Sequence, residues 1–343
     1  MQIKSLYLIG LVGLATTALH AQPTNGAAYW AASPPDCSAI SSNQTAVAIT
    51  NSAGTTIGYS CYMSGTFSWL AAGAGWATAI RVAAPASAPI GVDYTFYDAD
   101  GNDQSMDVTG SFPTSSNDVN FALYPNQPSE IDLQGLAGTN HSTTATGSVY
   151  AIFYCPDQDT CLNVLPQLIY SALPSIAWSL SVPITWDTAL SATWSAVGID
   201  NGGSKIVSLV VYNVDLVAHS YSIYVYNSAG TLVGTGVTPL IAPLPILGNG
   251  FYGEGGTYGF LLKDVIATPL PTGPFKVLVD GGPNGILSAV VVLQFDGPSG
   301  TSLQVAFDSA PGSGSTTAAV QRHSVRKMRA AATARHVFRA LPQ

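Results

Sequence analysis

The sequence predicts an all-β protein built from two tandem antiparallel β-sandwich domains. Its composition disfavours helices, because only 9% of the 343 residues are charged while 34 are Gly and 22 are Pro; soluble domains usually carry about a quarter charged residues. Hydrophobic residues still make up 47% of the chain, which is enough to bury a core. Two further observations, a period-two alternation of apolar residues and an internal repeat, predict strands and a duplicated unit.

The repeat relates residues 76–101 to residues 205–230 without a gap, at an offset of 129. Identity is low, but both segments contain a period-two strand that runs into a turn ending in glycine, Gly101 and Gly230 respectively. A glycine at that position is expected in a hairpin. The alternating positions are Val92, Tyr94 and Phe96 in the first segment, and Tyr221, Ile223 and Val225 in the second.

The match continues beyond this hairpin and sets the domain boundaries. Each copy spans about 120 residues with about seven short strands, which is typical of an antiparallel sandwich. We expect a first domain at 22–187, with added strands at 46–50 and 55–59, and a second domain at 190–310, the two packed end to end or side by side. The later matches are 146–153 with 272–279, 168–170 with 293–295, and 179–182 with 302–305.

Two motifs carry a resemblance to a known group of proteins. These are the hairpin Tyr97-Asp98-Ala99-Asp100-Gly101-Asn102 and the strand entry Thr146-Gly147-Ser148-Val149. Over most of residues 60–310 the chain resembles secreted bacterial proteins made of tandem immunoglobulin-like β-sandwiches, which implies two immunoglobulin-like domains. The Cys…Trp…Cys core of antibody domains is absent. The resemblance therefore concerns architecture and carries over no functional residue.

The N-terminus, residues 1–21, is predicted to be a secretory signal peptide. Lys4 precedes the apolar run Leu6–Leu19, and Ala21 supplies the small residue before the expected cleavage site. We therefore expect a secreted or cell-envelope protein. Two later uncharged stretches, 160–186 and 216–253, are interrupted by prolines, so we expect no transmembrane segment in the mature chain.

The C-terminal residues 311–343 are predicted to form a flexible basic tail. The tail holds six of the eleven basic residues, whereas residues 22–321 carry four basic and 19 acidic ones. One interpretation is a solvated, disordered tail. The alternative is docking onto an acidic surface, a neighbouring copy or an anionic envelope polymer.

The four cysteines are expected to form two disulfides. Cys155 and Cys161 lie close in sequence, at a place where the second copy has a Gly-rich turn, so a local disulfide that closes an enlarged hairpin loop is our prediction. Cys37 and Cys61 would then pair by elimination. Four cysteines allow three connectivities, and the choice remains open at this point.

An acidic hairpin is a candidate calcium site. Asp98, Asp100 and Asp103 place hard oxygen ligands in a tight turn, which Ca²⁺ favours. The alternative is a simple hairpin turn, because the second copy keeps this turn as Asn227-Ser228-Ala229-Gly230 without a carboxylate. Calcium is the one cofactor that the sequence suggests.

A second candidate is a ligand loop that contains Phe251, Tyr252, Glu254 and Tyr258. Aromatic rings beside a carboxylate suit a sugar, although simple loop packing explains the same residues.

Catalytic motifs are absent from the sequence, with no GxSxG, HExxH or P-loop pattern. His141 and His219 are expected to face solvent. We therefore predict a non-enzymatic structural, adhesion or binding protein, whose partners would be a second copy, a cell-surface polymer or a glycan, with no nucleic acid. The alternative is a carbohydrate-binding or carbohydrate-active protein, with Glu254 or Glu130 as the candidate acid.

Overall fold

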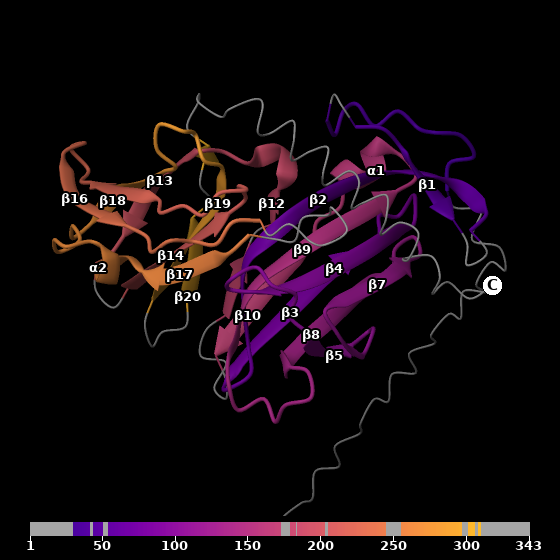
Figure 1. Cartoon of the computed structure of the whole chain (residues 1–343), viewed down its shortest axis with the longest axis horizontal. Coiled ribbons are helices and arrows are strands. Elements are labelled where there is room, and N and C mark those ends of the chain that lie inside the picture. Colours follow the sequence, from indigo (N-terminus) through magenta and orange to yellow (C-terminus); the bar gives the residue numbers. More distant parts are fainter. Residues whose placement is uncertain are drawn as a thin grey trace, which may run out of the picture.

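The computed structural model shows an all-β protein of antiparallel sheets, as the sequence predicts (Figure 1). It describes residues 30–41, 44–50, 54–172, 179–182, 184–202, 205–244, 255–296, 301–305 and 308–309. The predicted signal peptide and basic tail lie outside these residues. Within them the helical elements are short, namely α1 (Gln158–Leu162), the 3₁₀ turn η2 (Asp187–Ala189) and α2 (Leu262–Val265). None of these helices has the length and apolar character needed to cross a membrane.

The first half of the molecule, up to residue 186, forms two sheets. One has the order β1-β2-β9-β4-β7, with β12 also paired to β2, and the other has the order β11-β10-β3-β8-β5-β6. The strands of the first sheet are β1 (Val47–Thr50), β2 (Thr56–Ala72), β4 (Ile90–Asp98), β7 (Asp118–Leu123), β9 (Ala145–Cys155) and β12 (Ile184–Trp186). Those of the second are β3 (Trp76–Ala83), β5 (Met106–Gly110), β6 (Thr114–Ser116), β8 (Pro128–Leu136), β10 (Gln167–Ala172) and β11 (Ser179–Val182).

The second half, from residue 190 on, also forms two sheets, with the orders β16-β15-β18-β13-β21 and β17-β14-β19-β20. The strands of the first of these sheets are β13 (Thr193–Asp200), β15 (Ser222–Tyr226), β16 (Leu232–Val237), β18 (Pro274–Asp280) and β21 (Asp308–Ser309). Those of the other are β14 (Lys205–Asn213), β17 (Thr257–Leu261), β19 (Ser288–Asp296) and β20 (Thr301–Val305).

The two halves repeat one order of strand pairing. The neighbours β2-β9-β4-β7 correspond to β13-β18-β15-β16, and β11-β10-β3-β8 correspond to β20-β19-β14-β17. The registers agree as well, because Ile80 pairs with Ile131 and, 129 residues later, Leu209 pairs with Phe260. The internal repeat of the sequence is therefore also a repeat of topology.

One segment of the sequence alignment, 146–153 with 272–279, is shifted by two residues in the structure. Tyr94 pairs with Ala151, and its counterpart Ile223 pairs with Val279. Strands β9 and β18 therefore correspond at an offset of 128 and not at the expected 126. A two-residue shift keeps each side chain on the same face of the sheet, so the alternating pattern could not reveal it.

A second segment, 168–170 with 293–295, is shifted by one residue. Ile80 pairs with Leu168, whereas Leu209 pairs with Val292. Leu168 therefore corresponds to Val292 and not to Leu293. A shift of one residue reverses the faces of a strand, but the sequence pattern does not show it in β19, which is apolar at successive positions.

Each half has its core between its two sheets. Inward side chains of β4 and β9 meet those of β3 and β8 in the first half, and β13, β15 and β18 meet β14, β17 and β19 in the second. The largest fully buried side chains include Tyr94, Phe96, Phe153, Tyr212, Tyr221 and Phe275.

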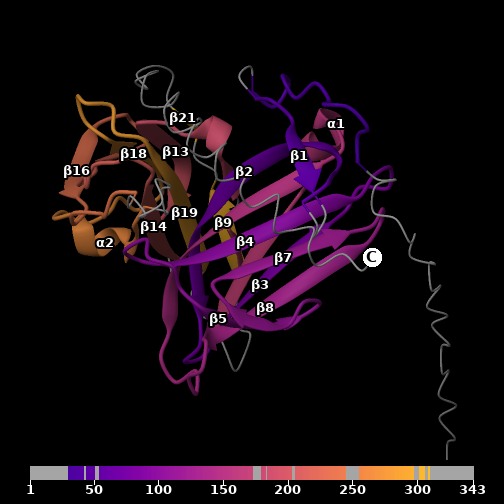
Figure 2. The same ribbon diagram turned by 45° about the vertical axis from the view of Figure 1, so that its right-hand side comes forward.

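The halves lie side by side, with the second half next to β2 in both views (Figures 1 and 2). Val210, Val291 and Leu293, on the outer face of the β14–β19 sheet, are buried as part of the first half's core. Burial of both faces explains the continuous apolar runs in β14 and β19, because a strand with one wet face would alternate. The junction is held by Asp187 Oδ2, which accepts hydrogen bonds from Ser64 Oγ at 2.6 Å and from Tyr150 OH at 3.2 Å.

Candidate binding site

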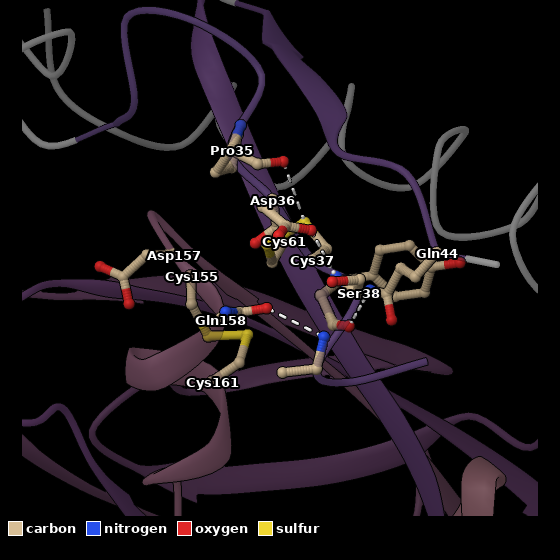
Figure 3. Close-up of a disulfide and its surroundings, with 12 residues drawn as sticks. Pro35, Asp36, Cys37, Ser38, Gln44, Cys61, Cys155, Asp157, Gln158 and Cys161 are labelled. Atoms are coloured by element: carbon tan, nitrogen blue, oxygen red, sulfur yellow. Dashed lines mark hydrogen bonds between the residues drawn. A yellow bond between two sulfur atoms is a disulfide. The ribbon is translucent and has the colours of Figure 1, made fainter. Parts of the chain in front are cut away.

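The cysteines lie together in two pairs at one end of the first sheet (Figure 3). Cys37 and Cys61 are bonded with a Cα–Cα distance of 5.5 Å, and Cys155 and Cys161 with one of 5.4 Å. Cys61 and Cys155 are also direct partners in the β2–β9 register. The two disulfides are therefore neighbours, and together they fasten the segment before β1 and the segment after β9 to the same end of the sheet.

The loop between Cys155 and Cys161 contains the helix α1, which the sequence analysis did not predict. Asp157 caps this helix, because its Oδ1 accepts a hydrogen bond from the Thr160 amide at 2.7 Å. Gln158 Oε1 accepts another from the Ala39 amide at 2.9 Å, across to the N-terminal segment (Figure 3). A single residue with a capping side chain was the only signal for this helix.

The candidate calcium turn is built in the same way in both halves. Asp98 Oδ1 accepts hydrogen bonds from the amides of Asp100 and Asn102, each at 2.9 Å. In the second half Asn227 Oδ1 accepts the corresponding bonds from Ala229 at 3.0 Å and Thr231 at 2.9 Å. A neutral amide oxygen thus does what the Asp98 carboxylate does, which is to hold a turn.

The Asp103 carboxyl, which belongs to the predicted site, has neighbours outside this turn, namely Asn117 by a hydrogen bond and the Asp118 carboxylate. The pKa of the Asp103 carboxyl is raised, first by partial burial and then by the nearby Asp118 carboxylate. Within the described residues there is no group of three acidic, His or Cys side chains placed to hold a metal. The calcium site stays a prediction from sequence.

His141 does not face solvent freely, contrary to expectation. Its Nε2 lies 2.9 Å from Asp107 Oδ2, and its ring packs over Gly135. The Ser115 hydroxyl also donates to Asp107, and these two hydrogen bonds lower the pKa of the Asp107 carboxyl. The contact joins residues 34 positions apart, which no local pattern could indicate.

His219 is half-buried and packs its ring edge-on against Tyr221, with centroids 4.9 Å apart. Its backbone forms an isolated bridge with Ile241. The His219 ring therefore packs against the Tyr221 ring and does not face solvent freely, contrary to the prediction.

The predicted ligand loop is described only in part. Phe251, Tyr252 and Glu254 lie outside the described residues. Tyr258 lies on β17 and stacks on Phe260 with ring centroids 5.3 Å apart. Glu130, the other candidate acid, forms an ion pair with Arg81 across β3 and β8.

A site that the sequence analysis missed is a β-bulge that occurs in both halves at the same place. In the first half, Ser68 and Trp69 of β2 stand opposite Ser148 of β9, where the pairing shifts between Phe67 and Leu70. Next to Ser148, β4 places Tyr97. We call Ser68, Trp69, Tyr97 and Ser148 the first bulge surface. Bulges of this kind redirect side chains and are common beside functional sites.

The second half repeats this arrangement at an offset of 129 along β13. Val197 and Gly198 stand opposite Lys276 of β18, where the pairing shifts between Ala196 and Ile199. Tyr226 of β15 is the direct partner of Lys276. We call Val197, Gly198, Tyr226 and Lys276 the second bulge surface.

The first bulge surface is where the second half contacts the first. Thr257 donates its hydroxyl to the Ser68 carbonyl at 2.7 Å and its amide to the Ala99 carbonyl at 2.9 Å. Gly259 lies so close to Trp69 that a Cβ there would approach the indole ring to 2.8 Å. Ser68, Tyr97 and Ser148 are at most 1% exposed. This surface is therefore occupied by protein.

The second bulge surface, by contrast, is open. Val197 is 65% exposed, and Tyr226 and Lys276 are half-buried. Together with Asn227, Pro274 and Phe275 they line a depression of about 440 Å³. It is a shallow depression that opens to solvent, not an enclosed cavity. Glycine at 198, where the first half has Trp69, leaves this space unfilled.

The chemistry of the depression is an aromatic face beside a cation. Lys276 Nζ lies 6.0 Å from the centroid of the Tyr226 ring. Among the ion pairs of the described residues, Arg81 is paired with Glu130 and Lys205 with Asp200, while Lys276 belongs to none. An ammonium group next to a ring can bind an anion while the ring packs against an apolar surface.

The sequence signal for this site was weak. The repeat evident in the sequence begins at residues 76 and 205, whereas the two bulges lie on the preceding strands, β2 and β13. Continued backwards at the same offset of 129, the repeat aligns Gly198 with Trp69, so the largest side chain is replaced by none.

A comparison of the chain with protein-family models and with curated proteins finds no match.

Proposed function

We propose that the protein is a secreted, non-enzymatic protein of the extracellular space or cell envelope, with a structural, adhesion or binding role. In this proposal its two halves are tandem immunoglobulin-like sandwich domains. Two disulfides are compatible with an oxidising compartment, where such bonds persist. The repeated strand order and the core between the sheets of each half support the two-domain interpretation.

The observation that carries the binding role is the difference between the two bulge surfaces. One is covered through the Thr257 contacts of the other half, and its counterpart is open. The first contact joins the two halves, and the open surface lies on paired strands of the second half. Binding sites are commonly presented by rigid β-frameworks in this way.

The proposal is tested by fractionating the producing cells and following the native protein. We expect it in the medium or the envelope fraction, and we expect purified protein to be retained on isolated envelopes without releasing soluble products from them. A cytoplasmic location would contradict the proposal, and so would turnover of an envelope polymer.

Carbohydrate binding is the second candidate function. The depression that contains Tyr226 and Lys276 favours it, because a ring face and a few convergent polar groups are what a sugar site requires. The same purified protein is tested for sugar binding and for release of soluble sugar products, so that binding is distinguished from hydrolysis.

A further inference from the structure

We propose that the second bulge surface binds a carboxylate-bearing sugar unit of an extracellular glycan. This inference rests on the proposed binding function and names the ligand class. The Lys276 ammonium would bind the carboxylate, and the Tyr226 ring would support the apolar face of the sugar ring. The two side chains are direct cross-strand partners, so both act on one ligand.

A third group adds a hydrogen-bond donor. Asn227 lines the same depression, and its Oδ1 is engaged by the amides of Ala229 and Thr231. The turn therefore fixes the orientation of this amide and leaves its Nδ2 to donate to a hydroxyl group. The surface thus offers a cation, a ring and a donor, the three contacts that an acidic sugar can use together.

The framework holds these groups in place. Two bulges flank the Tyr226–Lys276 pair, one in β13 opposite Lys276 and one in the β15–β16 pairing between Val225 and Tyr226. Beneath them Phe275 is 2% exposed and belongs to the core. A site on paired strands over a packed core is preorganised, which limits the ordering cost of binding.

A second copy of the chain is the alternative occupant, and the register disfavours it. The first bulge surface is bound by Thr257, which pairs with Tyr212. The equivalent residue of the first half is Pro128, which pairs with Ala83 at the same offset of 129. Proline has neither an amide hydrogen nor a hydroxyl group, so a second molecule could not repeat the two hydrogen bonds that join the halves.

The test is calorimetric titration of the purified full chain with trigalacturonate and, as a neutral sugar of equal length, cellotriose. We expect trigalacturonate to bind at least tenfold more tightly. Lys276→Gln should lower its affinity about tenfold or more, the loss expected for one charge-assisted contact. Tyr226→Ala should weaken both sugars. Lys263→Gln, which removes an exposed lysine from α2, is the matched control and should change neither affinity.

Three results would overturn the inference: no trigalacturonate binding at millimolar concentration, equal binding of both sugars, or unchanged affinity in Lys276→Gln. Sedimentation of the same variants gives a fourth result that would overturn it, because self-association lost in Lys276→Gln would assign the surface to a second copy.

Retention of the protein on isolated envelopes separates this inference from the proposed function. If Lys276→Gln is retained while no sugar binds, the ligand class is wrong and the binding function stands. If the unaltered protein is not retained, the proposed function itself fails.

Discussion

Removing the Cys37–Cys61 disulfide should destabilise the protein more than removing the Cys155–Cys161 disulfide. The bonds close loops with sequence separations of 24 and 6 residues respectively. The loop-entropy relation gives about 3.4 kcal/mol for the longer loop and about 2.2 kcal/mol for the shorter one at 25 °C. All four cysteines are at most 2% exposed, so similar cavity terms apply to both pairs and the difference of about 1.2 kcal/mol should remain.

The assay is urea unfolding at equilibrium of Cys37→Ala/Cys61→Ala and Cys155→Ala/Cys161→Ala, compared with the oxidised protein. Alanine is the suitable replacement because serine would bury a hydroxyl group. Limited proteolysis adds a local readout, because the first disulfide fastens the segment that carries Trp30, which covers the cluster of Tyr62, Tyr150 and Tyr154. We expect earlier cleavage near residue 37 in the first variant only.

An equal loss in both variants, or a larger loss in Cys155→Ala/Cys161→Ala, would refute this reasoning. The second result would mean that α1 and its cap depend on the bond, so that the native state and not the unfolded chain determines the cost. The variant lacking all four cysteines need not show the sum of the two losses, because Cys61 and Cys155 are register partners.

Two further predictions concern the contacts between distant segments. Thr257→Val should lower the free energy of unfolding by about 1 kcal/mol, since it removes a buried hydrogen bond to Ser68. The control Thr109→Val, at an exposed site on β5, should change the free energy of unfolding by less than about 0.5 kcal/mol. Equal effects of the two variants in urea unfolding would argue against Thr257 as a contact that joins the halves. Asp107→Asn should destabilise the protein at pH 7. Because the folded-state pKa of Asp107 is lowered, its contribution is present above the unfolded-state pKa and is lost as pH falls through the folded value, so the two proteins should converge in acid. A difference that persists at pH 2 would argue against the His141 and Ser115 hydrogen bonds as its cause.

Local features of the fold could be predicted from the sequence because they depend on neighbouring residues. The Asp98 and Asn227 turns lie at the predicted offset, and each ends in a glycine with positive φ, 83° at Gly101 and 78° at Gly230. Strand β1 covers most of the segment predicted at 46–50. Alternation and turn chemistry act within a few residues, which is the range over which a single sequence is informative.

The contacts that define the candidate site depend on distant residues, and the sequence could not supply them. Val290–Leu293 is apolar at four successive positions, a pattern that a half-exposed strand does not show. That run was a sign of a second buried face, but it could not identify the first half as the cover. Val291 and Leu293 are buried in the first half's core, and Thr257 and Gly259 of β17, in the same sheet, contact Ser68 and Trp69 of the first bulge surface. The second bulge surface is open within the part of the chain that the structure describes, and it carries Gly198 and Lys276 at the positions of Trp69 and Ser148. A surface that has a cation and no packing side chain at the bulge suits an anionic ligand better than a repeat of the contact that joins the halves.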